Sequence, residues 1–424
     1  MFYTTHHSHK RNLLAIFISL AITQACTANA VEEVSIQNIA SYQTSQATPT
    51  GNFPLGLYVN TRTGTLMYQG KPFRGIGVNY FDAFYRNNNT YVAGFAYLHS
   101  QKIPFIRFMA SPGFWPSDFN QYLTNKTAYF QRMDAFVHNA EINGIGLIPT
   151  LFWNAMSVSD VVGEPRDGWA NSSSKTIAFM RTYTTEMIER YKNSPAIWGW
   201  EFSNEMNSSD VDLLNESANW RPPVSPANGT PTYRTAADDL TTDQVKVAIS
   251  LFANTVRLYD KNRIILTGNN IVGGNQYHRA MLGQWDHDTI SQYGSISAAQ
   301  NQNPVNTITM HMYPNALNQY FADGSSSTYA DIVNTSMAAA AAQKKPLVIE
   351  EFGTSDTMGA SAAKTNFEQM LASIVAAKVP LASMWVYDFS FQNGTYNTTQ
   401  TNSRSYQLTD IIKANQAIRS GSGY

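Results

Sequence analysis

The chain has 424 residues, and its 29 lysine and arginine residues almost balance its 30 aspartate and glutamate residues. Because there is no excess of positive charge, we expect no nucleic-acid partner. Charged residues make up only 14% of the chain and aromatic residues 12%, which is typical of a secreted protein that binds neutral, hydroxyl-rich ligands by stacking.

The first thirty residues have the pattern of a cleaved signal peptide. The basic residues Lys10 and Arg11 precede the apolar run Leu13 to Ile22, and the small residues Ala28 and Ala30 follow it. This run is too short to anchor the chain stably in a bilayer. We therefore predict that residues 1–30 are removed, that the protein is secreted to the periplasm or the medium, and that the mature chain does not associate with a membrane.

The only cysteine, Cys26, lies inside this segment, so the mature chain would contain none. A lipoprotein anchored through Cys26 is the alternative, but Thr23 and Gln24 stand where small or aliphatic residues would be expected. A chain without thiols suits an oxidising compartment, and about 390 residues can bury a large core without disulfides.

Residues 31–54 are rich in serine, threonine, glutamine and proline, and we predict a flexible leader there. The next stretch alternates in polarity and contains turn signals at Thr63-Gly64 and Gly70-Lys71. This pattern predicts an N-terminal hairpin that leads into a first buried strand.

From this strand onward, short apolar runs alternate with helical patterns. The expected strands are FRGIGVN, IPFIRFMA, GIGLIPTLFW, AIWGWEFSN, RIILTGN, NTITMHMY, PLVIEEFG and LASMWVYDF, and the expected helices include Thr127–Glu141, Lys175–Tyr191, Thr242–Tyr259 and Ala362–Ala377. Gly144 stands where a helix C-cap would, and Thr241 with Gln244 fits a capping box. Eight such strands predict one α/β domain, a single (β/α)8 TIM barrel over residues 55–424. A doubly wound sheet is the alternative, but the first strand is not followed by a complete glycine-rich phosphate turn.

Carboxylates stand at two of the predicted strand ends. Glu205 follows the fourth strand, and Glu350 and Glu351 end the seventh. Functional groups of such barrels lie at the carboxyl ends of the strands, and these two strands face each other across the mouth. Two facing carboxylates supply what glycosidic cleavage needs, because one protonates the leaving oxygen and the other attacks or activates water.

The motifs WEFSNE and VIEEFG, together with FRGIGVNYFDAF, FIRF, HMYP and SMWVYDF in this order, resemble glycoside hydrolase family 5, which includes cellulases and mannanases. The resemblance covers the chain from about residue 55 onward. It implies a retaining β-glycosidase that hydrolyses a β-linked polysaccharide of mannan or glucan type, with Glu205 as the acid/base and Glu351 as the nucleophile.

The resemblance also implies roles around this pair. Arg107 would support the nucleophile, and Asn204 would bind the 2-hydroxyl of the reacting sugar. His311 and Tyr313 match the pattern of the sixth strand, and Trp385 would stack beneath the sugar. Trp153, at the end of the third strand, is a further candidate for substrate binding, although a core position is an equal alternative.

Glu351 is preferred to Glu350 because the family pattern places the nucleophile directly before an aromatic residue and a glycine, here Phe352 and Gly353. Neighbouring side chains of a strand point to opposite faces, so we expect Glu350 to point toward the helix layer, unless a β-bulge intervenes. The chain departs from the family pattern at Met206, where proline is usual, and at the third strand, which lacks a histidine.

Further expectations and two alternatives concern activity and partners. No metal and no organic cofactor is needed, because the carboxylates supply the chemistry, and the chain is expected to be a monomer. An exo-acting β-glycosidase or exopolysaccharide hydrolase is an alternative, since the long segment Met206–Asp239 could close one end of the cleft. A non-catalytic glycan-binding barrel is the alternative from another class of protein.

Overall fold

The computed structural model describes residues 53–86, 89–208, 210–314 and 327–421. Its centre is an eight-stranded parallel sheet with the order β8-β7-β6-β5-β4-β11-β10-β9. The predicted signal peptide and nearly all of the predicted leader lie outside the described residues. The strands of this sheet are β4 (Gly75–Asn79), β5 (Phe105–Met109), β6 (Gly146–Phe152), β7 (Gly199–Ser203), β8 (Ile264–Leu266), β9 (Ile308–Met312), β10 (Leu347–Phe352) and β11 (Leu381–Met384).

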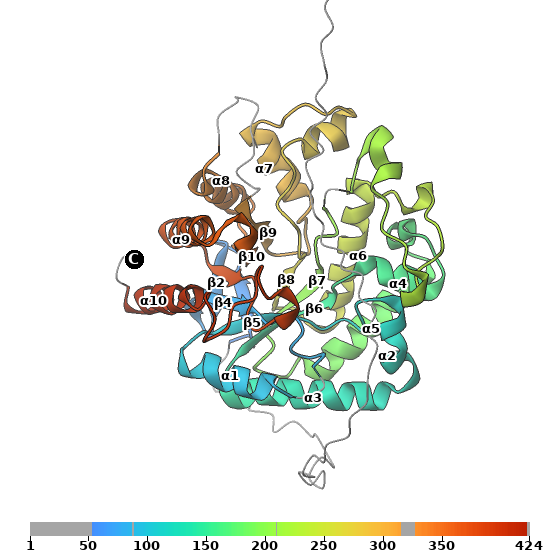
Figure 1. The fold of residues 1–424 in the computed structure, drawn as a ribbon. Coiled ribbons are helices and arrows are strands. Elements are labelled where there is room, and N and C mark those ends of the chain that lie inside the picture. The colour runs from blue at the N-terminus through green and yellow to red at the C-terminus, as the bar shows by residue number, and fades with distance from the viewer. Residues whose placement is uncertain (1–52, 87–88, 209, 315–326, 422–424) are drawn as a thin grey trace, which may run out of the picture. The chain divides into compact units, whose positions relative to one another are not determined.

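Helices follow the strands and surround the sheet (Figure 1), as predicted for a (β/α)8 barrel. The helices are α1 (Tyr91–Ser100), α2 (Asn120–Thr124), α3 (Lys126–Asn143), α4 (Ala155–Val162), α5 (Lys175–Tyr191), α6 (Thr242–Tyr259), α7 (Ile290–Ala299), α8 (Tyr329–Ala342), α9 (Ala360–Ala376) and α10 (Tyr406–Ser420). Gly144 ends α3 with a φ of 62°, and Thr241 forms the capping box with Gln244 at the start of α6. Within the described residues, no helix is long and apolar enough to cross a membrane.

Side chains join the first and last strands of the sheet order, β8 and β9. The hydroxyl oxygens of Thr267 and Thr309 lie 2.6 Å apart, and the hydroxyl of Thr307 donates to the carbonyl of Ile265 at 2.7 Å. These bonds connect the edge strands β8 and β9, so the eight strands form a nearly closed barrel.

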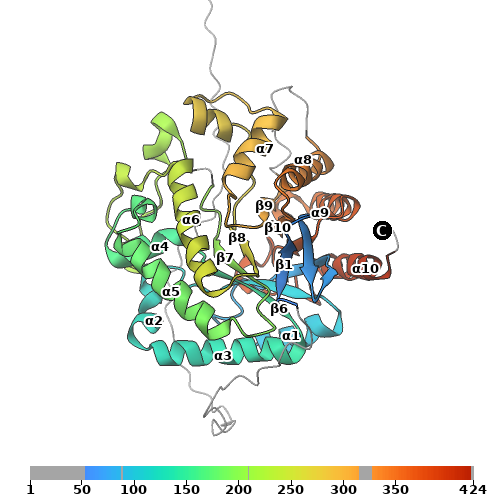
Figure 2. The ribbon, with the colours of Figure 1, turned by 180° about the vertical axis from the view of Figure 1, so that it is seen from behind.

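The amino-terminal end of the barrel is apolar and is covered by the predicted hairpin. β1 (Leu57–Asn60) and β2 (Thr65–Tyr68) pair in antiparallel fashion, with β3 (Lys71–Pro72) beside them (Figure 2). Leu57 and Leu66 are buried in a cluster with Phe105, Ile148 and Trp198. The hairpin therefore seals the end of the barrel where the strands begin, opposite the end where they finish.

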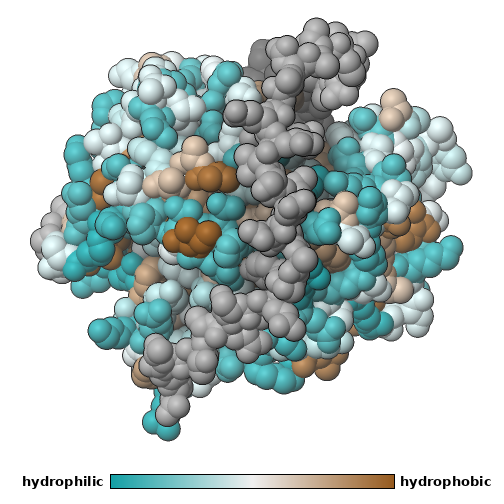
Figure 3. Space-filling model, turned by 90° about the horizontal axis from the view of Figure 1, so that it is seen from below, coloured by the Kyte–Doolittle hydropathy of each residue, from teal (hydrophilic) through white to brown (hydrophobic). Residues whose placement is uncertain are grey.

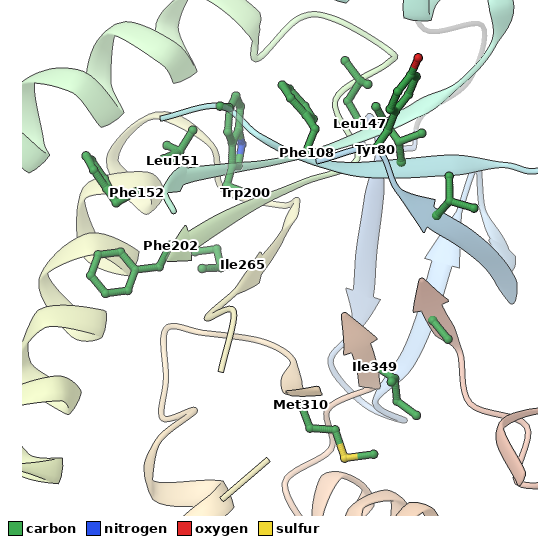
Figure 4. Close-up of a cluster of buried hydrophobic side chains, with 14 of the residues drawn as sticks. Tyr80, Phe108, Leu147, Leu151, Phe152, Trp200, Phe202, Ile265, Met310 and Ile349 are labelled. Atoms are coloured by element: carbon green, nitrogen blue, oxygen red, sulfur yellow. The ribbon is translucent and has the colours of Figure 1, made fainter. Parts of the chain in front are cut away.

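The main apolar core lies between the strands and the helices. Trp200, Phe202, Met310 and Ile349 belong to it and point outward from their strands (Figure 4). The face of the molecule in Figure 3 is mainly hydrophilic, with hydrophobic residues in small separate patches. Because strand side chains alternate, the neighbours of these outward residues face the barrel interior. The half of this interior that lies near the carboxyl ends of the strands holds polar side chains.

Candidate active site

Glu205 lies in a tight turn directly after β7. Its φ is +52°, a left-handed conformation that costs free energy for a residue with a side chain. The turn is held by the Glu205 amide, which donates to the carbonyl of Gly268 at 2.7 Å. Gly268 itself has a φ of +70°, and an added Cβ would lie 1.6 Å from the carbonyl oxygen of Ser203. Glycine is therefore required for the chain after β8 to approach Glu205 this closely.

Glu351 reaches the interior through a β-bulge in β10. Ile349 pairs with Met310 and Glu351 pairs with His311, so the register with β9 shifts by one residue at Glu350. The expectation that Glu350 points toward the helix layer is wrong. Its carboxylate lies inside the barrel, with one oxygen 3.8 Å from His311 Nε2. The bulge breaks the alternation and turns both neighbouring glutamates inward.

The glycine of the Glu351-Phe352-Gly353 motif has a steric role. A Cβ added to Gly353 would lie 2.6 Å from the carbonyl oxygen of Trp385. The chain after β11 can therefore pass close to the end of β10, where the amide of Trp385 donates to the carbonyl of Phe352 at 2.9 Å.

Arg107 of β5 is the centre of the polar interior and is fully buried. Its guanidinium donates to Glu351 at 2.5 Å and to Asn204 at 2.8 Å, and Nε lies 2.8 and 2.9 Å from the two oxygens of Glu201. Burial by itself would lower the pKa of Arg107, but the charges of Glu201 and Glu351 outweigh it and raise the pKa. Arg107 therefore stays cationic and holds the Glu351 carboxylate in place.

Glu205 and His311 form the second half of the site. His311 Nδ1 lies 2.8 Å from a Glu205 oxygen, and 31% of the Glu205 side chain is exposed, whereas the His311 side chain is fully buried. Burial raises the pKa of Glu205 to about 7, although the charge of Arg107 opposes this shift. Burial also lowers the pKa of His311 to about 4, so the imidazole is neutral near pH 7. The opening toward solvent gives Glu205 access to a ligand.

The two predicted catalytic carboxylates are brought together. One oxygen of Glu205, one oxygen of Glu351 and a ring nitrogen of His311 all lie within 4.8 Å of one another. The hydroxyl of Tyr313 donates to the second oxygen of Glu351 at 2.5 Å. Burial, followed by the charge of Glu351, raises the pKa of Tyr313 well above its usual value, so this hydroxyl remains a donor.

Two tryptophans lie beside the ionic centre. The Arg107 guanidinium carbon lies 4.3 Å from the centre of the Trp153 ring, which is only 6% exposed. This stacking supports the arginine, and a direct contact between Trp153 and substrate stays a prediction. Trp385 is partly exposed, and its Nε1 donates to Gln392 at 2.9 Å, which fixes the orientation of the ring.

Sequence reasoning assigned no role to Glu201, Asn79 or Glu350, although all three lie against the site. Glu201 also accepts a hydrogen bond from Thr150 at 2.6 Å, and Asn79 Oδ1 accepts one from Arg107 at 3.0 Å. The two-residue period in WEFSNE places Glu201 on the same face as Ser203, so alternation along β7 could have identified it.

Glu205, His311 and Glu351 are also the residues, within the described part of the chain, whose donor atoms are close enough together to hold a metal ion. Their donor atoms already take part in hydrogen bonds or ion pairs. His311 is bonded to Glu205, and Glu351 is paired with Arg107 and Tyr313. The arrangement therefore suits proton transfer and nucleophilic attack without a bound metal.

A (β/α)8 barrel with two facing carboxylates at the carboxyl ends of its fourth and seventh strands has the site of a glycoside hydrolase. Comparison of sequences gives the family. The chain belongs to glycosyl hydrolase family 5, the cellulase family, whose sequence model matches residues 66–390. The family predicted from the motifs is confirmed.

Several proteins of similar sequence are named as mannan endo-1,4-beta-mannosidases. A probable mannan endo-1,4-beta-mannosidase A from Aspergillus flavus is 26% identical over 216 residues, which cover 45% of this chain and 53% of that protein. The chain thus spans about half the length of this curated relative. An endo-1,4-beta-mannanase from Rhizomucor miehei superimposes with a TM-score of 0.62 at 18% identity, over 86% of this chain and 99% of that one. A family 5 mannosidase from the same organism gives a TM-score of 0.60 at 13% identity, over 88% and 100%.

Proposed function

We propose that this chain is a retaining β-glycosidase that hydrolyses β-1,4 linkages of a mannan-type polysaccharide. The observation that carries the proposal is that one oxygen of Glu205 lies within 4.8 Å of one oxygen of Glu351. Retaining glycosidases have carboxyl groups ~5–5.5 Å apart, whereas inverting ones need ~6.5–9.5 Å to admit a water molecule. An approach of two oxygens to within 4.8 Å supports the shorter, retaining separation, in which one carboxylate attacks directly.

In the first step, a Glu351 oxygen attacks the anomeric carbon and displaces the leaving oxygen, which takes the proton of Glu205. Arg107 and Tyr313 hold the two Glu351 oxygens, so the attacking group is oriented before substrate binds. In the second step, ionised Glu205 removes a proton from water, which attacks the same carbon and releases Glu351.

The electrostatics of the site match these two roles. The pKa of Glu205 is raised to about 7, so this group can both give and take a proton near neutral pH. Glu351 forms a 2.5 Å ion pair with Arg107, which holds the attacking oxygen in place. The carboxyl proposed to exchange a proton is thus the one with the raised pKa, and the one proposed to attack is the one held by Arg107.

The mannan-type substrate rests on the relatives, which are named as mannan endo-1,4-beta-mannosidases. The test is a panel of soluble linear mannan, glucan, xylan and bacterial exopolysaccharide, with the chain lengths of the products measured over time. Internal cleavage of mannan, giving a mixture of oligosaccharides early in the reaction, supports the proposal. Release of single sugars from chain ends would instead indicate exo action. A preference for glucan would show that glucan, and not mannan, is the substrate.

A Glu205→Gln, Glu351→Gln double variant is the control for contaminating activity. An activated aryl β-glycoside separates the enzyme from a non-catalytic glycan-binding barrel. The binding protein would bind mannan but release no aryl alcohol above this control.

We also propose that the protein is a secreted monomer whose signal peptide ends near residue 30. The basic and apolar pattern of residues 1–30 supports secretion, and all residues of the site come from one chain. N-terminal sequencing of protein recovered from the culture medium tests the cleavage, and light scattering tests the monomer. Protein retained in the membrane fraction through Cys26 would overturn this assignment.

A further inference from the structure

A second buried carboxyl lies behind His311, on the side away from Glu205. Glu350 is 1% exposed, and within the described residues neither of its carboxylate oxygens makes a hydrogen bond of normal geometry, although the Glu201 carboxylate is close enough to compete with His311 for its proton. His311 Nε2 is also buried and without a partner there, and it faces Glu350 Oε2 at 3.8 Å. The terminal torsion of a glutamate side chain is broad, so a small rotation brings the two atoms into hydrogen-bond distance.

The charges around Glu350 decide its protonation. Arg107 of β5 is the cation that faces it, and the carboxylates of Glu201 on β7 and Glu351 on β10 compete for that cation. Glu201 binds Arg107 and Thr150, and Glu351 binds Arg107 and Tyr313. Ionising a third carboxyl here would leave two uncompensated negative charges in a buried centre, which is costly.

Glu350 is therefore the carboxyl that keeps its proton. In agreement, burial and then the charge of Glu201 raise the pKa of Glu350 well above its usual value. A protonated carboxyl is a hydrogen-bond donor, and a neutral imidazole has one acceptor nitrogen.

We propose that Glu350 is a positioning residue which donates its proton in a hydrogen bond to His311 Nε2 and so fixes the tautomer in which His311 Nδ1 donates to Glu205. The effect on catalysis rests on the proposed function, whereas the hydrogen bond and the His311 tautomer do not depend on it. The Nδ1–H bond stabilises the ionised form of Glu205, which the second step of the reaction uses as a base. Without the donor, His311 can adopt the other tautomer, in which Nδ1 accepts a proton from Glu205 and favours its neutral form.

The first test is ¹⁵N NMR of the histidine rings in the unliganded protein, with the His311 signals assigned from their loss in His311→Gln. The ring-nitrogen shifts distinguish a protonated nitrogen from an unprotonated one. We expect protonated Nδ1 and unprotonated Nε2 near neutral pH. A protonated Nε2 would overturn the inference, and this readout does not depend on activity.

The second test compares two variants. Glu350→Gln keeps a neutral hydrogen-bond donor, so the His311 tautomer should not change. The alkaline limb in the pH profile of kcat/KM should also stay at the same pH. Glu350→Leu removes the donor, so the limb should move to higher pH by about one unit or more, because ionised Glu205 loses a hydrogen bond. If Glu350 were ionised, Glu350→Gln would remove a negative charge and shift the limb to lower pH, which would contradict the inference.

The thermal transition of Glu350→Leu is measured first, and its pH profile is compared only if the variant folds. The Glu350→Gln result tests the protonation of Glu350 without it. A wild-type protein with the expected tautomer but no activity on any glycan would sink the proposed function and support the inference about Glu350.

Discussion

Arg107 and Glu351 form a 2.5 Å ion pair inside the barrel, where their side chains are 1% and 5% exposed. The same guanidinium binds Glu201, so removing it leaves two buried carboxylates without their cation. We predict that Arg107→Met lowers the free energy of unfolding by ~3–5 kcal/mol, the range found when one partner of a buried ion pair is removed. Urea denaturation measures this loss.

The matched control for Arg107 is Lys364→Met, which breaks an exposed ion pair with Glu368 on α9. Exposed pairs contribute little to stability, so this variant should unfold close to wild type. Equal effects of the two substitutions would show that Arg107 contributes no more than a surface charge.

Tyr313 provides a second test, because its hydroxyl donates to Glu351. Hydrogen bonds to charged groups contribute ~1.5–3 kcal/mol, so Tyr313→Phe should lower kcat by about 10- to 100-fold. The effect should fall mainly on kcat, with a smaller change in KM, because the bond orients the attacking oxygen. Steady-state kinetics on soluble mannan measure both quantities.

Tyr293→Phe is the control for loss of a buried tyrosine hydroxyl. Tyr293 contacts Ser336 between α7 and α8, away from the carboxylates. Its loss should reduce stability slightly and leave kcat unchanged. An equal fall of kcat in both variants would mean that Tyr313 acts through general stability.

The pH dependence of kcat/KM should have an alkaline limb near pH 7. The pKa of Glu205 is raised to about 7, and the acid form donates the proton to the leaving group. As the pH rises through this value, Glu205 loses its proton and kcat/KM falls. An activated aryl glycoside needs little protonation, so Glu205→Ala should lose the alkaline limb on that substrate. A limb that persists in Glu205→Ala would assign the titration to another group.

Activity should survive exhaustive chelation. In the proposed mechanism the two carboxylates supply the proton and the nucleophile, and the donor atoms of Glu205, His311 and Glu351 are already engaged in the contacts described above. Assays before and after dialysis against a chelator test this expectation. Loss of activity that a single added metal restores, at unchanged thermal stability, would refute it.

Much of the fold follows from local patterns. The eight apolar runs, the capping box of α6 and the glycine at Gly144 are short-range signals, and the structure places elements where they predict them. Helix α5 spans Lys175–Tyr191 as predicted, and α3 extends one residue before and two residues beyond its predicted range Thr127–Glu141. Such boundaries depend on caps that the sequence displays.

The interior of the site could be predicted only in part. Strict alternation predicts opposite faces for Glu350 and Glu351, but the bulge in β10 depends on pairing with β9, which no local pattern reveals. Likewise, the sharing of Arg107 between Glu201 and Glu351 joins three strands that are distant in sequence. These contacts arise from tertiary packing, so residue types at strand ends identify the candidates but not their partners.

The most direct test of the central claim is the configuration of the product that azide forms with two variants. In Glu351→Ala, azide takes the place of the nucleophile and should restore turnover with a product of inverted configuration. In Glu205→Ala, azide attacks the covalent intermediate on Glu351 and should give a product of retained configuration. Without azide, the activation free energy of each variant should rise by several kcal/mol, where ~1.4 kcal/mol corresponds to a tenfold loss of rate. The anomeric configuration is read by NMR on an activated aryl β-mannoside. Opposite configurations for the two variants are predicted, and the same configuration for both, or no rescue of either, would contradict the assignment of Glu351 as nucleophile and Glu205 as acid/base.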